Sequence, residues 1–233
     1  MLMGSDASLR ILALDTSTPR GSVALLQGQE LASELRLFSL ETHSARLLRS
    51  IRFLLEGAGW RLTDLNLIAA GIGPGSFTGI RIGIATALGL AQALRIPFAG
   101  ISGLDALARQ ARLPDGRLGV VMDAQRSQVY YAEYEATRGG VRAVIRPRLL
   151  YPSDLRTLLG HRRLYLVGEG AVRYFSHLRN PGRDFPKVLE TDLFIAASIG
   201  RLALAHKRKW CSGRGLKSVP LYIRAPDARK PKR

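Results

Sequence analysis

A glycine-rich segment between two apolar runs constrains the fold of this chain most. It reads GIGPGSFTGIRIG over 71–83 and joins the apolar residues 67–70 to an uncharged stretch at 82–94. This order predicts a strand, a tight turn and a helix, because glycine reaches backbone torsions that other residues avoid and proline fixes its own φ. Ser76 or Thr78 can cap the helix, and unpaired N–H groups at a helix start can hold an anion.

The composition is ordinary for a globular protein with one large domain or two small ones. The chain has 233 residues, of which 46% are hydrophobic and 23% are charged. The single cysteine, Cys211, cannot form an internal disulfide, and the first ten residues lack the pattern of a secretory signal. We therefore expect a cytoplasmic location. We expect no membrane span at 67–94, because the glycine–proline turn and Arg81 interrupt the apolar run.

The net charge of +17 favours an anionic partner, and nucleic acid is the first candidate. Arginine supplies 29 of the 35 basic residues, so a compositional preference for arginine explains the charge equally well. No strand shows aromatic residues interleaved with basic ones, the pattern of many RNA-binding strands. Residues 224–233 hold five basic residues and one acidic residue, and we expect them to form a disordered basic tail.

A strand–turn–strand pattern occurs twice. One apolar run ends in Asp15 and another in Asp123, and a polar turn and a returning strand follow each of them. Third strands are predicted over 30–37 and 141–149, and helical patterns follow in both halves. The repetition predicts two related α/β lobes, with a chance repeat of a common hairpin as the alternative.

Two helices of the first half have distinctive surfaces. The helix expected over 42–56 has an apolar stripe, and the helix expected over 79–95 is smooth because it is rich in alanine and glycine. The smooth helix is apolar on more than one side, so it must be buried or covered by a partner. The lobes are expected at 1–104 and 105–223, and a helix over 191–207 can return to pack on the first lobe.

Four motifs also match one protein family in wording and in order. LALDTST at 12–18, His43-Ser44, GPGSFTGIRIG at 73–83 and PLYIR at 220–224 follow one another as in the TsaB (YeaZ) family, which the chain resembles most densely over 10–105. The resemblance implies a two-lobed fold of the actin-like ATPase superfamily (the ribonuclease H-like, or ASKHA, fold). Both lobes of that fold arise from one duplicated sheet-and-helix domain.

The resemblance implies a non-catalytic scaffold subunit of the machinery that makes threonylcarbamoyladenosine in tRNA. A catalytic paralogue, TsaD, would transfer the threonylcarbamoyl group to the adenosine next to the anticodon of ANN-reading tRNAs. A small ATPase, TsaE, would join them, and the chain would contact tRNA through the complex. The chain would bring no cofactor, although ATP or ADP can lie at the interface with the partner, and it could form a homodimer when alone. The expected partner contacts, from both distinctive helices, are Leu47, Leu48, Ile51, Ala85, Leu88 and Gln92.

Two aspartates could instead serve ATP chemistry. In ATP-handling proteins of this superfamily, an aspartate at the tip of the first strand positions magnesium or water near phosphate. We favour simple turn chemistry for both aspartates, because neither turn has the run of glycines that approaches a phosphate. The alternatives are an ATP-dependent phosphotransferase acting across a cleft, and a direct tRNA-binding module. The candidate nucleotide- or anion-binding residues are Asp15, Thr16, Ser17, Gly75, Ser76, Arg81 and Asp123.

The other candidate groups give weaker signals. Arg81 lies in the first turns of a helix, where its charge opposes the helix dipole, so we expect an anionic partner and suggest Asp15. Glu169, between two glycines, weakly resembles an adenosine-contacting turn. His43 has Leu47, not a second histidine, four residues later, so we expect no metal site. No arrangement of residues suggests a catalytic nucleophile.

Overall fold

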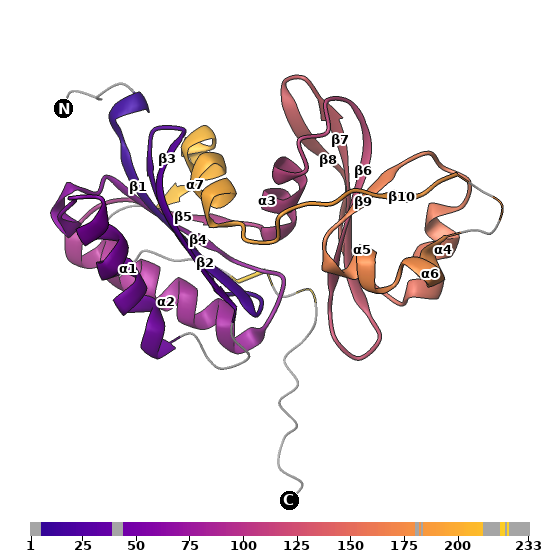
Figure 1. The fold of residues 1–233 in the computed structure, drawn as a ribbon, viewed down its shortest axis with the longest axis horizontal. Helices are drawn as coiled ribbons and strands as arrows, with labels where there is room; N and C mark the ends of the chain where they lie inside the picture. Colours follow the sequence, from indigo (N-terminus) through magenta and orange to yellow (C-terminus); the bar gives the residue numbers. More distant parts are fainter. Residues whose placement is uncertain are drawn as a thin grey trace, which may run out of the picture.

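The computed structural model describes residues 6–38, 44–179, 182, 184–211, 220–221 and 223. They form two lobes, each built on one β-sheet (Figure 1). The first half contains β1 (Arg10–Asp15), β2 (Arg20–Gln27), β3 (Glu30–Phe38), α1 (Ser44–Gly57), β4 (Leu67–Gly71), α2 (Phe77–Leu94), β5 (Phe98–Ile101) and α3 (Gly103–Gln110). The second half contains β6 (Gly116–Asp123), β7 (Val129–Thr137), β8 (Gly140–Leu150), α4 (Pro152–Leu159), β9 (Tyr165–Val167), α5 (Glu169–Arg173), α6 (Phe175–Leu178), β10 (Lys187–Val188), α7 (Ala196–Ala205) and β11 (Trp210–Cys211). Single 3-10 turns lie at Asp6–Ser8, Leu62–Asp64 and Lys207–Lys209.

The two sheets share one topology. The first has the strand order β11-β5-β4-β1-β2-β3 and the second the order β10-β9-β6-β7-β8, so β6 to β10 take the places of β1 to β5. In each lobe three antiparallel strands are followed by a strand that pairs in parallel with the first of them. The predicted duplicated α/β architecture is confirmed.

Alternate residues of the strands feed two different cores. Leu12 and Leu14 of β1 face the core under α1 and α2, whereas Ile11 and Ala13 face a core that contains α7. This follows from the two-residue period of a strand, which sends successive side chains to opposite faces of the sheet. The first sheet is therefore covered on both faces, which explains why its central strands are apolar throughout.

The last helix of each half packs on the sheet of the other half. Helix α3 follows β5 but contacts β6, β7 and β8, and α7 follows β10 but contacts β1, β2, β4 and β5. The two helices also contact each other between the lobes (Figure 1). The predicted boundary between residues 104 and 105 falls within the first turn of α3. Helix α7 and strand β11 lie with the first sheet, which is the return to the first lobe that the sequence suggested for a helix over 191–207.

Helix α2 has one buried side and one exposed side. By length and composition alone it could cross a membrane, a test that core helices of globular proteins also pass. Ile80, Ile84, Ala87 and Ala91 recur at helical spacing and are buried, and the helix packs on β4. Packing on its own sheet therefore accounts for one apolar side of α2 and leaves the other side exposed.

A buried carboxylate joins the strands of the second sheet. Glu133 on β7 is 1% exposed, and its two oxygens lie 3.0 and 2.8 Å from Nη1 of Arg162. The hydroxyl of Tyr131 donates to the same carboxylate at 2.8 Å, and Arg117 lies 3.6 Å from it. Burial, and then the charge of Glu133, raises the pKa of Tyr131, so this hydroxyl stays protonated and keeps donating.

We predict that Glu133→Ala lowers the unfolding free energy by about 2–4 kcal/mol, because the Tyr131 hydroxyl and the Arg162 guanidinium lose a buried acceptor. Urea denaturation measures this change. Glu135→Ala is the matched control, since Glu135 lies on the same strand and pairs with Arg142 in an exposed position. The control should leave stability almost unchanged, and equal losses in both variants would contradict the role given to burial.

Candidate functional site

The turn after β1 and the turn before α2 bind each other. The hydroxyl of Thr16 donates to the carbonyl oxygen of Gly79 at 2.7 Å, and the N–H of Ser76 donates to the carbonyl oxygen of Ser17 at 2.7 Å. The hydroxyl oxygen of Ser76 in turn accepts from the N–H of Gly79 at 3.2 Å, which caps α2. Two N–H groups that could have held an anion here, those of Ser76 and Gly79, are thus bonded within the chain.

Three glycines of the motif are required by this close approach. A Cβ atom on Gly75 would lie 2.2 Å from the carbonyl oxygen of Ser17, and one on Gly79 would lie 2.0 Å from that of Thr16. A Cβ on Gly83 would lie 2.4 Å from the Thr16 hydroxyl oxygen. These glycines therefore bring the start of α2 against the β1 turn, and their spacing reflects packing between two parts of the backbone.

The carboxylate of Asp15 is bonded within its own turn. It is 1% exposed, and its two oxygens accept from the N–H of Ser17 at 3.3 Å and from the Ser17 hydroxyl at 3.2 Å. Gly71 at the end of β4 passes so close that a Cβ there would lie 2.3 Å from Oδ1 of Asp15. This is the turn chemistry favoured from the sequence.

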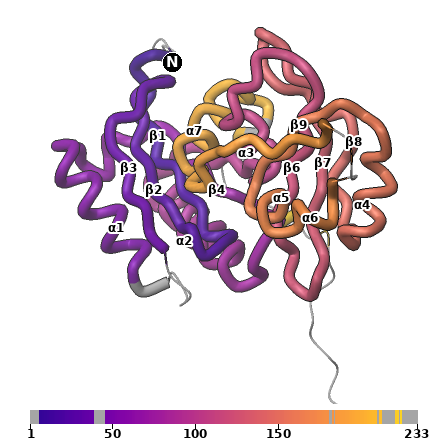
Figure 2. The backbone as a smooth tube through the Cα atoms, turned by 45° about the vertical axis from the view of Figure 1, so that its right-hand side comes forward, coloured from indigo at the N-terminus to yellow at the C-terminus, as the bar shows by residue number. Residues whose placement is uncertain are grey.

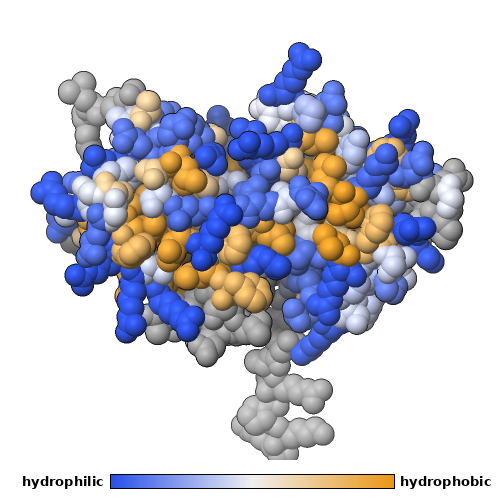
Figure 3. Space-filling model, viewed as in Figure 1, coloured by the Kyte–Doolittle hydropathy of each residue, from blue (hydrophilic) through white to orange (hydrophobic). Residues whose placement is uncertain are grey.

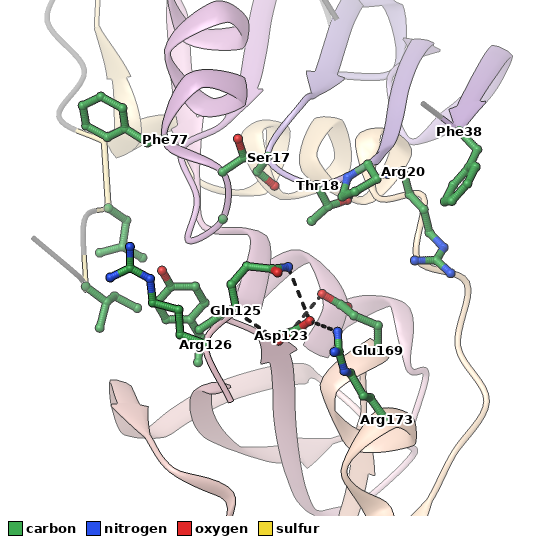
Figure 4. A pocket seen from close by; sticks show the side chains of 17 residues that line it. Ser17, Thr18, Arg20, Phe38, Phe77, Asp123, Gln125, Arg126, Glu169 and Arg173 are labelled. Carbon is green, nitrogen blue, oxygen red and sulfur yellow. Dashed lines mark hydrogen bonds and ion pairs between the residues drawn. The ribbon is translucent and has the colours of Figure 1, made fainter. Parts of the chain in front are cut away.

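The aspartate of the second lobe is also engaged. Oδ1 of Asp123 accepts from the N–H of Gln125 at 3.0 Å, and Oδ2 pairs with Nη1 of Arg173 at 2.6 Å. The N–H of Asp123 donates to Oε1 of Glu169 at 3.3 Å, as Figure 4 shows from close by. Burial raises the pKa of Glu169, the backbone N–H donors and Arg20 oppose the rise, and the charge of Asp123 adds to it.

The two aspartate turns face each other across a cleft of about 670 Å³ between the lobes. Ser17, Gly75, Ser76 and Asp123, four of the seven candidate nucleotide- or anion-binding residues, line it. The C-terminal residues Leu221 and Ile223 form another part of its wall. Of the other candidates, Asp15 and Thr16 are buried, at 1% and 4% exposed, beneath the first-lobe turn.

The third remaining candidate, Arg81, stacks on an aromatic ring. Its guanidinium carbon lies 3.7 Å from the centroid of the Phe77 ring, and its side chain is exposed on α2. This cation–π contact gives the charge of Arg81 one partner, and the predicted Arg81–Asp15 pair stays a prediction.

Sequence reasoning missed several residues of the cleft. Arg20 at the start of β2 stacks on Phe38, with 5.6 Å from its guanidinium carbon to the ring centroid, and both line the cleft. The β6–β7 turn places Gln125 and Arg126 at φ of 60° and 54°, left-handed values that side chains rarely adopt. Nothing in the sequence signals such torsions at these residue types, so this part of the site was not predictable.

The partner-binding residues predicted on α1 divide into two groups. Leu47 and Ile51 are 2% and 3% exposed and belong to the core beneath the helix, so the prediction that they face a partner is corrected. Leu48 is 57% exposed, as a contact residue requires. Phe53 is 65% exposed and was missed, because one aromatic residue outside the stripe gives no periodic signal.

The residues predicted on α2 lie on its outer side or at its margin. Ala85 and Gln92 are exposed, and Leu88 is half-buried at the margin of the core. Gly89 lies between them, and a Cβ there would meet no atom within 4 Å. Helices α1 and α2 lie side by side on one face of the first sheet (Figure 1), and Figure 3 shows hydrophobic surface on this lobe, broken by charged side chains.

Metal ligation finds no support in the part of the chain that the structure describes. No group of three or more His, Cys, Asp or Glu side chains within that part is arranged to hold a metal ion. His43 lies outside the described residues.

Comparison with known proteins finds a matching family model and several similar relatives. A family model described as "TsaD: tRNA N6-adenosine threonylcarbamoyltransferase" matches residues 38–177. The "tRNA threonylcarbamoyladenosine biosynthesis protein TsaB" of Escherichia coli is 38% identical over 151 residues, which are 61% of this chain and 65% of that protein. The protein of the same description from Haemophilus influenzae is 34% identical over 177 residues, which are 72% of this chain and 75% of that protein. The chain thus spans just under two thirds of the Escherichia coli relative's length.

Solved structures agree with these relatives. YeaZ from Pseudomonas aeruginosa superimposes with a TM-score of 0.75 at 31% identity, covering 88% of this chain and 95% of that one. Component A of the (R)-2-hydroxyglutaryl-CoA dehydratase of Acidaminococcus fermentans superimposes with a TM-score of 0.51 at 12% identity and shows the fold alone.

We predict opposite effects for two alanine substitutions in α2. Gly79→Ala should lower the unfolding free energy by at least about 2 kcal/mol, because its methyl group would press on the Thr16 carbonyl. Gly89→Ala should raise it by about 0.5–1 kcal/mol, because alanine favours the helix and its methyl group meets open space.

Urea denaturation of both variants measures these effects. A Gly79→Ala protein as stable as the wild type would contradict the close contact described between the turn after β1 and the start of α2.

Proposed function

We propose, since this chain belongs to the TsaB (YeaZ) family, that it is a non-catalytic subunit of the machinery that makes threonylcarbamoyladenosine in tRNA. In this role it binds a catalytic paralogue of the TsaD type and supports the transfer of a threonylcarbamoyl group to the adenosine next to the anticodon of ANN-reading tRNAs. The pathway is proposed because the relatives are described as threonylcarbamoyladenosine biosynthesis proteins. The exposed surface of α1 and α2 supports the scaffold role.

The exposed side of α1 and α2 is the observation that carries the proposal. Leu48 and Phe53 expose more than half of their surface on α1, where water meets large apolar groups. The outer side of α2 is smooth at Ala85 and Gly89, which allows another helix to approach closely. Two helices of a related partner, laid against these two, would bury the apolar groups in a helix bundle.

Three groups of the first-lobe turns that a nucleotide site would use are engaged within the chain. The N–H groups of Ser76 and Gly79 are bonded within the chain, and Asp15 is buried and bonded to Ser17. A phosphate site needs such donors to be available, and it needs glycines that leave space for the ligand. This disagreement supports a subunit that performs no transfer chemistry of its own.

The remaining parts of the proposal follow from the family. The chain brings no cofactor, and ATP or ADP lies at the interface with the TsaD-like partner. A TsaE-like ATPase joins the complex, and the complex binds tRNA. The protein works in the cytoplasm. Without the partner, two copies of the chain can cover the α1–α2 surface of each other as a homodimer.

The alternative function is an ATP-dependent phosphotransferase, and the cleft with Asp123 in its wall is the observation that favours it. Calorimetric titration of the purified chain with Mg-ATP separates the two functions. We expect no heat of binding in the cleft and no turnover, because the first-lobe donors are engaged. Tight binding with phosphate transfer would replace the scaffold function by the enzymatic one.

We predict that Leu48→Asp combined with Phe53→Asp weakens binding to the TsaD-like partner by at least about 100-fold, because carboxylates would be buried at the contact. Titration of the partner with the purified chain measures the affinity.

Val172→Asp is the matched control, because Val172 is 67% exposed on α5 of the second lobe. It should leave the affinity unchanged. Full affinity of the double variant, or an equal loss in the control, would contradict the proposed surface.

A further inference from the structure

The chain crosses from the second lobe to the first between β10 and α7. Residues 189–195, called the crossing segment below, lead from β10 in the second sheet to α7, which packs on the first sheet. In Figure 2 the crossing segment runs over α3, which packs on the second sheet and also contacts α7. Such a segment is where a hinge between two lobes can absorb changes of backbone torsion.

A glutamine of the second lobe holds the crossing segment. Nε2 of Gln110, the last residue of α3, donates to the carbonyl oxygens of Asp192 at 2.7 Å and of Phe194 at 3.1 Å. Oε1 of the same side chain accepts from the hydroxyl of Ser198 at 2.5 Å. Ser198 lies on α7 and is 5% exposed. Gln110 therefore bonds a helix of the second lobe both to the crossing segment and to a helix that packs on the first sheet.

The first lobe holds the same region from its own side. Nη2 of Arg36, on β3, lies 2.6 Å from Oδ2 of Asp192, and the Arg36 guanidinium carbon lies 5.4 Å from the centroid of the Phe194 ring. The N–H of Ala196, the first residue of α7, donates to the hydroxyl oxygen of Ser22 on β2 at 3.1 Å. The crossing segment and the start of α7 are thus bonded to both lobes.

A rotation of one lobe against the other would break these bonds. If α3 moved away from α7, the buried hydroxyl of Ser198 and the amide of Gln110 would lose their partners, which is unfavourable. Arg36 contributes less, because its side chain is 50% exposed and exposed ion pairs are weak. The bonds of Gln110 therefore oppose a rotation of the lobes most.

We propose that Gln110 is a clamp that holds the two lobes at one angle, so that the cleft between them keeps one width. Many enzymes close a loop or a lobe over their substrate to exclude water from the reaction. A cleft of fixed width suits a subunit that performs no transfer chemistry. The inference goes beyond the proposed function and is independent of it, because none of the clamp residues lies on α1 or α2.

Distances between two spin labels, measured on the full chain by pulsed electron paramagnetic resonance, test the clamp. Ala32→Cys on β3 and Arg156→Cys on α4 place one label at an exposed position of each lobe, and Cys211→Ser removes the native thiol. We expect one narrow distance distribution for this labelled chain. Gln110→Met keeps the length of the side chain and removes its hydrogen bonds, so it should broaden the distribution at least about twofold or add a second distance.

The matched control is Arg109→Ala, because Arg109 precedes Gln110 on α3 and its side chain is exposed. The control should leave the distribution narrow. Urea denaturation shows whether each variant folds. If Gln110→Met does not fold, Ser198→Ala gives the same test, because it removes the hydroxyl from which Gln110 accepts.

Three results would overturn the inference. The first is a broad or two-peaked distribution in the labelled chain without further change, which would show that the lobes move freely. The second is a distribution that stays narrow in the folded clamp variant. The third is equal broadening in the control and in the clamp variant.

Discussion

The contact between the β1 turn and the start of α2 is the constraint on which the first lobe depends. Thr16 donates to Gly79 and Ser76 donates to Ser17. Glycine occupies the positions at which a Cβ atom would clash with the other turn. Because this contact fixes where α2 begins, it also decides which side of α2 enters the core. The outer side that remains is smooth and lies beside the apolar side chains of α1.

The second lobe repeats this arrangement in another form. A Cβ on Gly168 would lie 2.4 Å from the carbonyl oxygen of Val121, and one on Gly170 would lie 2.9 Å from the carbonyl carbon of Met122. The glycines at the start of α5 thus bring that helix against β6, as the glycines around the start of α2 bring it against the β1 turn. In both lobes glycine serves packing between backbone segments, while Asp15 and Asp123 are held by neighbouring groups.

Local patterns made much of this fold predictable. The two hairpins whose first strands end in Asp15 and Asp123 are predicted by apolar runs and turn residues. Their repetition predicts the duplicated sheets. The packing of α3 on the second sheet was not predictable, because it depends on which sheet offers an uncovered face, whereas the return of a helix over 191–207 to the first lobe was suggested by the sequence. The two-residue strands β10 and β11 are too short to give a periodic signal.

The candidate surfaces were predictable only in part, for a physical reason. An apolar stripe identifies the side of a helix that enters the core, so Leu47 and Ile51 signalled burial in this chain and not contact with another. The exposed Phe53 stands alone in the sequence and becomes informative only once its burial is known.

The central claim is that the aspartate turns are engaged inside the protein while the outer side of α1 and α2 receives a partner. Amide hydrogen exchange of the full chain, measured alone, with Mg-ATP and with the TsaD-like partner, tests both halves of it. The account predicts that the amides of Ser76 and Gly79 exchange slowly in all three samples, and that only the partner adds protection over 44–57 and 77–94. Added protection at both aspartate turns with Mg-ATP, and none over the two helices with the partner, would contradict it.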